Sequence, residues 1–168
     1  MNILVAGIGN IFQGDDAFGC EVTRLLGART LPADVRVIDF GIRGLDLSYA
    51  LMSKPDLTIL IDATQRGGAP GTVYTIEPTP SILKDSDEVA ISAHAMDPAN
   101  VFRAVQAMGG ELGPILLVGC EPADLGGEDG RMGLTPPVAE AVPIAADVVT
   151  SLISKALVSE KCQEVLIT

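Results

Sequence analysis

Short, nearly uninterrupted apolar runs alternate along the chain with longer segments of mixed polarity. Apolar runs of this length, bounded by Gly, Asp or Pro, are typical of strands that are buried on both faces of a sheet. Two of the longer segments begin with residues that favour a helix start, Gly14-Asp15-Asp16 with Asp15 as the N-cap, and Thr135-Pro136. We therefore predict strands at Asn2–Gly7, Val35–Phe40, Leu57–Ala63, Thr72–Glu77 and Ile115–Cys120, and helices at Gly14–Arg29, Gly44–Ser53, Pro98–Met108 and Pro136–Leu157.

The strand Thr72–Glu77 differs from the others in how it is connected. Only about eight residues, rich in Gly and Pro, separate it from the preceding strand, whereas a parallel crossover needs about a dozen or more. We therefore expect this strand to run antiparallel at an edge of the sheet. The predicted fold is α/β: a three-layer sandwich with a twisted, five-stranded, mostly parallel sheet, one antiparallel edge strand, and helices on both faces.

A length of 168 residues favours one domain over 1–168, in which 158–168 would form a flexible tail. Hydrophobic residues make up 48% of the chain, yet no uncharged apolar run reaches the length of about 18 residues that a membrane span needs. The longest candidate, Leu134–Val149, contains Glu140 and Asp147. We therefore expect no transmembrane helix. No basic segment precedes the first strand, so we expect no signal peptide either, and we predict a cytoplasmic protein.

The charge and the cysteines exclude several classes of function. A net charge of −11 argues against nucleic acid or an anionic membrane as a partner, because both require a basic surface. The three cysteines, Cys20, Cys120 and Cys162, lie far apart and form no CxxC motif. We interpret them as reduced thiols, and Cys20 and Cys120 as core residues rather than nucleophiles.

Most of the candidate functional side chains follow a predicted strand. The carboxyl ends of parallel strands meet at one edge of a sheet, where a binding crevice forms. Carboxylates gathered there repel one another unless a cation lies among them, and a divalent metal with an imidazole ligand supplies that charge. Such a set of oxygen and imidazole ligands fits Ni²⁺, Zn²⁺ or Mn²⁺. The residues concerned are Asn10, Asp15 and Asp16 after the first strand, Asp39 after the second, Asp62 after the third, Glu121 after the fifth, and His94, the only histidine, in a long loop.

Each of these residues also has a simpler explanation. Asp15 is explained as a helix cap, Asp16 as an acid that the helix dipole favours, and His94 as a solvated loop residue. Gly7-x-Gly9 with Asp39 resembles part of a dinucleotide site. We reject that alternative because Phe12 stands at the third glycine position and the acids at the helix start would repel a pyrophosphate.

Other enzyme classes lack their motifs. The sequence contains no GxSxG element and no Walker A loop, and no serine or cysteine lies in an identifiable strained turn. Peptide hydrolysis without such a nucleophile must use a water molecule that a carboxylate or a metal positions.

Seven segments, in order, resemble motifs of the nickel–iron hydrogenase maturation proteases. The first, from Gly7 to Gly19, is similar to the family's opening G-x-G-N stretch followed by D-[DE]-x-x-G. The second, Asp39–Gly44, departs from the family's D-G-G-T-x-G pattern. Its residues Phe40 to Arg43 replace G-G-T-x and place a bulky ring and a cation beside the cleft. Asp16 likewise stands where some members have the longer Glu. The other similar segments are Ile61–Ala63, Pro70–Thr72, Ser92–His94, Gly119–Pro122 and Gly133–Pro136.

The resemblance implies a cytoplasmic endopeptidase that removes a C-terminal extension from a hydrogenase large-subunit precursor after nickel insertion. It implies a metal-binding trio at Asp16, Asp62 and His94, with Asp39 as a candidate for water activation. The nickel is expected to arrive with the precursor, and no organic cofactor and no fixed oligomer is implied, so a monomer is plausible. A second hypothesis is a non-catalytic module that binds or delivers nickel.

Overall fold

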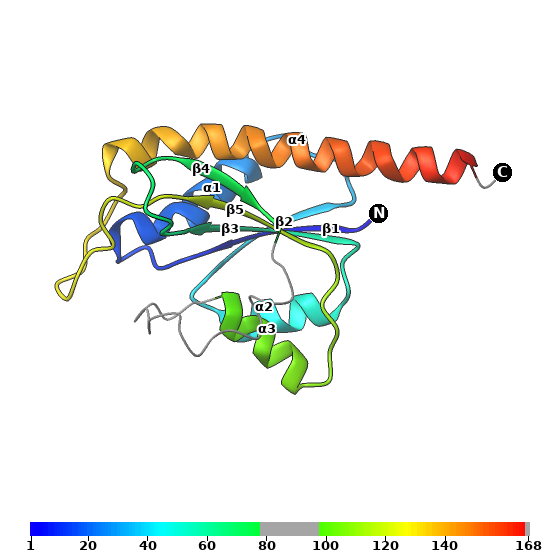
Figure 1. Cartoon of the computed structure of the whole chain (residues 1–168), viewed down its shortest axis with the longest axis horizontal. Helices are drawn as coiled ribbons and strands as arrows, with labels where there is room; N and C mark the ends of the chain where they lie inside the picture. Colours follow the sequence, from blue (N-terminus) through cyan, green and yellow to red (C-terminus); the bar gives the residue numbers. More distant parts are fainter. Residues whose placement is uncertain (78–97, 167–168) are drawn as a thin grey trace.

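The computed structural model describes residues 1–77 and 98–166, which form a five-stranded sheet between two layers of helices (Figure 1). The strands are β1 (Ile3–Ile8), β2 (Val35–Gly41), β3 (Leu57–Ala63), β4 (Val73–Ile76) and β5 (Ile115–Cys120). Their order in the sheet is β2-β1-β3-β5-β4. The helices are α1 (Phe18–Gly27), α2 (Gly44–Met52), α3 (Pro98–Ala107) and α4 (Pro136–Leu166), and a 3-10 turn, η1 (Gly14–Ala17), precedes α1.

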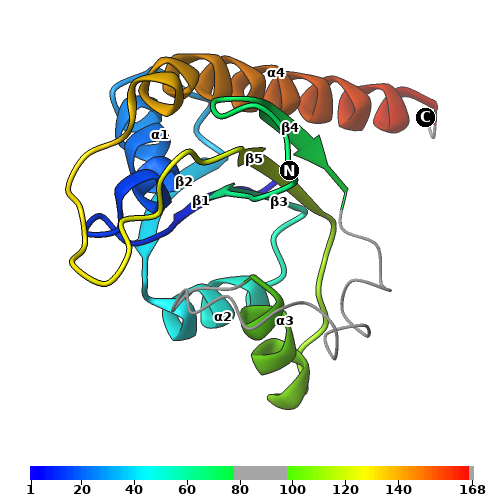
Figure 2. The ribbon, with the colours of Figure 1, turned by 60° about the vertical axis from the view of Figure 1, so that its left-hand side comes forward.

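The alternation of apolar side chains along each strand divides the core between the two faces of the sheet. In β1, Ile3 and Val5 pack with α1 and α4, whereas Leu4 and Ala6 pack with α2 and α3. Figure 2 shows the two helix layers on opposite sides of the strands. The central strands β1 and β3 are almost wholly buried, which explains why their sequences are continuous apolar runs.

The predicted fold class is confirmed, including its antiparallel edge strand. β4 pairs antiparallel with β5, from Val73 opposite Cys120 to Ile76 opposite Leu117, and β5 is parallel to β3. The short β3–β4 connection therefore reverses the chain direction, as its length required. β4 lies beside β5 rather than beside β3, so β5 is inserted between the two strands that are neighbours in sequence.

The last helix is longer than predicted. α4 continues to Leu166, so the backbone over most of 158–168 is helical and not a tail without regular structure. In addition, Pro136–Glu160 is long and apolar enough to cross a membrane by length and composition, although no such helix was expected. One side of α4 contributes Val138, Ala145 and Val149 to the core against α1, and core helices commonly meet the same criterion.

Candidate active site

Three acidic residues lie at the carboxyl ends of three neighbouring strands. The backbone register places Gly7 of β1 opposite Asp39 of β2 on one side and opposite Ile61 of β3 on the other. Asp62 follows Ile61 directly, so Asp39 and Asp62 flank the end of β1. This parallel register therefore brings Asp39 and Asp62 to the same edge of the sheet.

Asp16 reaches the same edge from the turn that follows β1. One oxygen of its carboxylate, Oδ2, accepts a hydrogen bond of 2.7 Å from the backbone N–H of Asn10. Gly9, with φ +131°, allows this approach, because a Cβ there would lie 1.8 Å from the carbonyl oxygen of Asp16. Since η1 packs against β3, Asp16 is held beside the strand that carries Asp62. Each of the two residues is only 9% exposed.

Strand alternation separates the directions of Asp39 and Asp62. Asp39 has the same parity as Val37, which packs on the α1 side of the sheet. Asp62 has the same parity as Leu60, which packs on the α2 and α3 side. The two carboxylates therefore leave the sheet on opposite faces although their strands end together.

The third predicted metal ligand, His94, lies outside the described residues. Within 1–77 and 98–166, no group of three or more His, Cys, Asp or Glu side chains is placed to hold a metal ion. The assignment of Asp16, Asp62 and His94 as one set stays a prediction. The structure supplies two little-exposed carboxylates, one in the turn after β1 and one near the end of β3, and carboxylates are hard oxygen ligands of the kind a divalent cation accepts.

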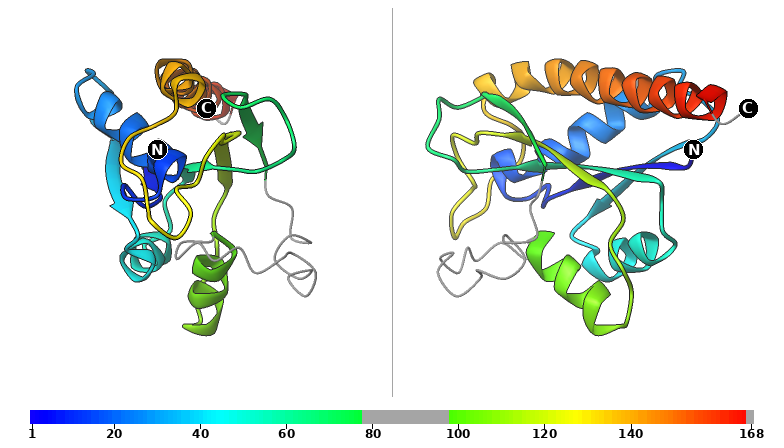
Figure 3. Two further views of the ribbon diagram at one scale, coloured as in Figure 1. Left: turned by 90° about the vertical axis from the view of Figure 1, so that its left-hand side faces the viewer. Right: turned by 45° about the vertical axis from the view of Figure 1, so that its right-hand side comes forward.

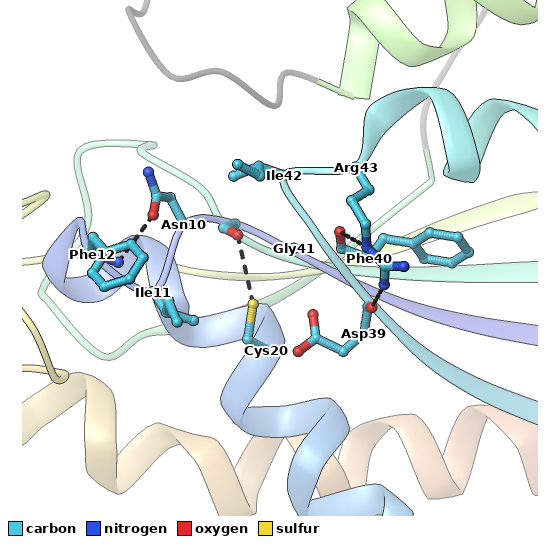
Figure 4. A pocket seen from close by; sticks show the side chains of 10 residues that line it. Asn10, Ile11, Phe12, Cys20, Asp39, Phe40, Gly41, Ile42 and Arg43 are labelled. Atoms are coloured by element: carbon cyan, nitrogen blue, oxygen red, sulfur yellow. Dashed lines mark hydrogen bonds between the residues drawn. The ribbon is translucent and has the colours of Figure 1, made fainter.

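A cavity of about 310 Å³ opens between the turn after β1 and the end of β2 (Figure 4). Asp39 and Cys20 lie on its wall, and Ile11, Phe12 and Ile42 also line it. Phe12 is 58% exposed and Ile42 is 56% exposed, which is unusual for large apolar side chains. An open, mostly apolar cavity with one carboxylate on its wall suits an apolar side chain of a peptide next to a reacting bond.

Cys20 is buried but contacts the site, which sequence reasoning did not anticipate. Its Sγ lies 3.6 Å from the carbonyl oxygen of Gly9 and faces the carboxylate of Asp39 (Figure 4). Burial, and then the charges of Asp39 and Asp16, raise the pKa of the Cys20 thiol to about 12. The thiol therefore stays protonated near neutral pH, which agrees with its interpretation as a core residue and not a nucleophile.

Asp15 is not the N-cap of a helix, so that prediction was wrong. No side chain caps η1 or α1, and the residue at the N-cap of α1 is Ala17. The carboxylate of Asp15 is fully buried and instead accepts hydrogen bonds from the N–H groups of Ala123 and Asp124 and from both the N–H and the hydroxyl of Thr135. It joins the turn after β1 to the loop between β5 and α4.

Glu121 also turns away from the three acids. Its carboxylate accepts hydrogen bonds from the N–H groups of Arg66 and Gly67 and from the hydroxyl of Tyr74. Burial opposes its charge, but these donors outweigh that effect and hold the pKa of Glu121 below its ordinary value. Glu121 therefore fixes the β3–β4 loop and is not placed with Asp16 and Asp62.

Comparison with known proteins identifies the family. A family model described as hydrogenase maturation protease matches residues 20–152. The chain belongs to the hydrogenase maturation proteases. The hydrogenase 2 maturation protease of Escherichia coli K12 is 32% identical to it over 141 residues, which cover 82% of each chain. The hydrogenase expression/formation protein HupD of Rhodobacter capsulatus is 34% identical over 150 residues, covering 85% of this chain and 67% of that protein.

Solved structures of maturation proteases share the fold. The hydrogenase maturating endopeptidase HybD of Escherichia coli superimposes with a TM-score of 0.77 and 30% identity, covering 93% of this chain and 94% of that one. The maturation protease HycI of Thermococcus kodakarensis gives a TM-score of 0.71 and 26% identity, over 91% and 92% of the two chains. The family resemblance drawn from seven short motifs is thus confirmed over nearly the whole length.

Proposed function

We propose that this chain is the endopeptidase that removes the C-terminal extension of a nickel–iron hydrogenase large-subunit precursor, and that nickel already bound by the precursor is what it recognises. Membership of the family supports the peptidase activity. The observation that carries the nickel part is the pair Asp16, in the turn after β1, and Asp62, near the end of β3, which are both little exposed. Carboxylate oxygens are ligands that a divalent cation accepts, and the precursor's nickel is that cation in our proposal.

Asp39 is our candidate for activating water. It is exposed to solvent and lies on the cavity wall, so a water molecule reaches its carboxylate while the peptide occupies the cavity. The water oxygen attacks the carbonyl carbon of the scissile bond as Asp39 takes one proton. The carbon–nitrogen bond then breaks, and the proton passes to the leaving amine. Fixing the peptide through its nickel supplies the orientation, a contribution that reaches about 7–11 kcal/mol in well-aligned cases.

The mass of the precursor tests this proposal. After incubation of the wild-type chain with nickel-loaded precursor, we expect a product that has lost the mass of its C-terminal extension. Nickel-free precursor should keep its full mass under the same conditions. A precursor of unchanged mass, together with tight binding of nickel by the isolated chain, would instead support the non-catalytic delivery module.

A further inference from the structure

β2 leaves one side of its backbone without a partner strand. It lies at the end of the strand order and pairs only with β1. In the left-hand view of Figure 3, no element of the described chain lies beyond β2 in the plane of the sheet. An open edge of seven residues is a template for a further strand, unless charge, proline or a covering element blocks it.

The hydrogen-bond phase shows which groups of β2 face outward. The N–H of Ile3 donates to the carbonyl of Asp34 over 3.0 Å, which fixes the parallel pattern. Arg36 and Ile38 then direct their N–H and C=O groups to β1, whereas the C=O of Phe40, at the shift in register, accepts from the N–H of Arg43. Val37 and Asp39 direct theirs away from it. Within residues 1–77 and 98–166, the N–H of neither residue donates a hydrogen bond.

The open stretch has a defined start and end. The N–H of Val35 is already used, because it donates to the carbonyl of Pro32 over 3.0 Å. At the other end the guanidinium of Arg43 donates to the carbonyl of Asp39 and so occupies that acceptor. The free groups therefore lie between Val35 and Asp39, and they end at the residue that also forms the cavity wall.

We propose that the C-terminal extension of the precursor binds in an extended conformation as an added strand along the outer edge of β2. Its backbone would bond to Val37 and to the N–H of Asp39, and the next apolar side chain would enter the cavity between Phe12 and Ile42. The continuity of the open edge with Asp39 selects this occupant, because a strand bound there delivers its backbone to the water-activating carboxylate. This inference rests on the proposed function of the chain.

The variant Val37→Pro tests the docking mode. Proline removes the outward N–H of Val37 but no bond to β1, and edge positions whose N–H faces solvent tolerate it. The matched variant Val37→Ala shortens the side chain and keeps the N–H. With nickel-loaded precursor, Val37→Pro should raise KM about tenfold with little change in kcat, whereas Val37→Ala should raise it far less. Equal KM values for the two variants would overturn the docking mode.

Hydrogen exchange in the otherwise intact chain provides a second readout if Val37→Pro fails to fold. Asp39→Asn should hold the precursor uncut, and the amide of Val37 should then exchange at least about tenfold more slowly with precursor than without it. Unchanged exchange would contradict strand addition. The two proposals fail separately: wild-type chain that leaves the precursor whole contradicts the function, and cleavage without protection of Val37 contradicts only the docking.

Discussion

Replacing Asp62 by asparagine is expected to reduce the rate of precursor cleavage more than about a hundredfold, because neutral amides are much weaker nickel ligands than carboxylates. Asp16→Asn should have an effect of the same size, since it keeps an oxygen for the N–H of Asn10 but loses the charge. We expect His94→Ala to abolish processing as well. The measurement is the mass of nickel-loaded precursor over time, beside the melting temperature of each variant, which should change little.

Asp147→Asn is the matched control for these variants. Asp147 is 74% exposed on α4, where it pairs with Arg29 over 2.8 Å, far along the chain from the strand ends. The variant Asp147→Asn loses the same charge as the other two. It should keep the wild-type stability, because an exposed ion pair contributes little, and it should leave the cleavage rate unchanged. If Asp16→Asn and Asp62→Asn both process nickel-loaded precursor at the wild-type rate, the two carboxylates are not nickel ligands.

Replacing Asp15 by asparagine should lower the free energy of unfolding by about 3 kcal/mol, the largest stability loss that we predict for a single polar group. Four hydrogen bonds of 2.6 to 2.9 Å end on this buried carboxylate. An asparagine oxygen can replace only one carboxylate oxygen, so its amide N–H groups would face the N–H of Thr135. Urea unfolding, with the change in midpoint and slope, measures the loss.

Asp124→Asn in the same loop separates this effect from a general loss of charge. Asp124 accepts from the N–H of Gly126 and pairs with Arg131 over 2.7 Å, but it is partly exposed. Water can replace its partners, so the expected loss of unfolding free energy is about 1 kcal/mol or less. Asp15→Asn with the wild-type midpoint would show that the buried network does not hold the loop in place.

The architecture could be predicted from the sequence because strands that are buried on both faces consist almost entirely of apolar residues. β1, β3 and β5 are continuous apolar runs, and the length of the β3–β4 connection alone required the antiparallel direction of β4. The position of β4 beside β5 could not be predicted, since the connection rule constrains direction and not the neighbour. The extent of α4 was also missed: the helix was predicted to end at Leu157, and it continues to Leu166.

The roles of the acids depended on contacts that are remote in sequence. The partners of Asp15 lie more than 100 residues away, so a local cap was the only signal available for it. Glu121 was grouped with the strand-end acids because its position fits, yet its partners are the N–H groups of the β3–β4 loop. Cys20 was correctly placed in the core, but its approach to Asp39 depends on how α1 crosses β2.

The central claim is that Asp16 and Asp62 bind nickel that belongs to the precursor. X-ray absorption at the nickel edge tests it most directly. The two samples are the nickel-loaded precursor alone and the same precursor in complex with the variant Asp39→Asn, which should leave it uncut. We predict that the complex adds oxygen or nitrogen ligands to the nickel, and that the further change Asp62→Asn removes one of them. Identical nickel spectra with and without this chain, in samples that the wild-type chain does cleave, would contradict the account.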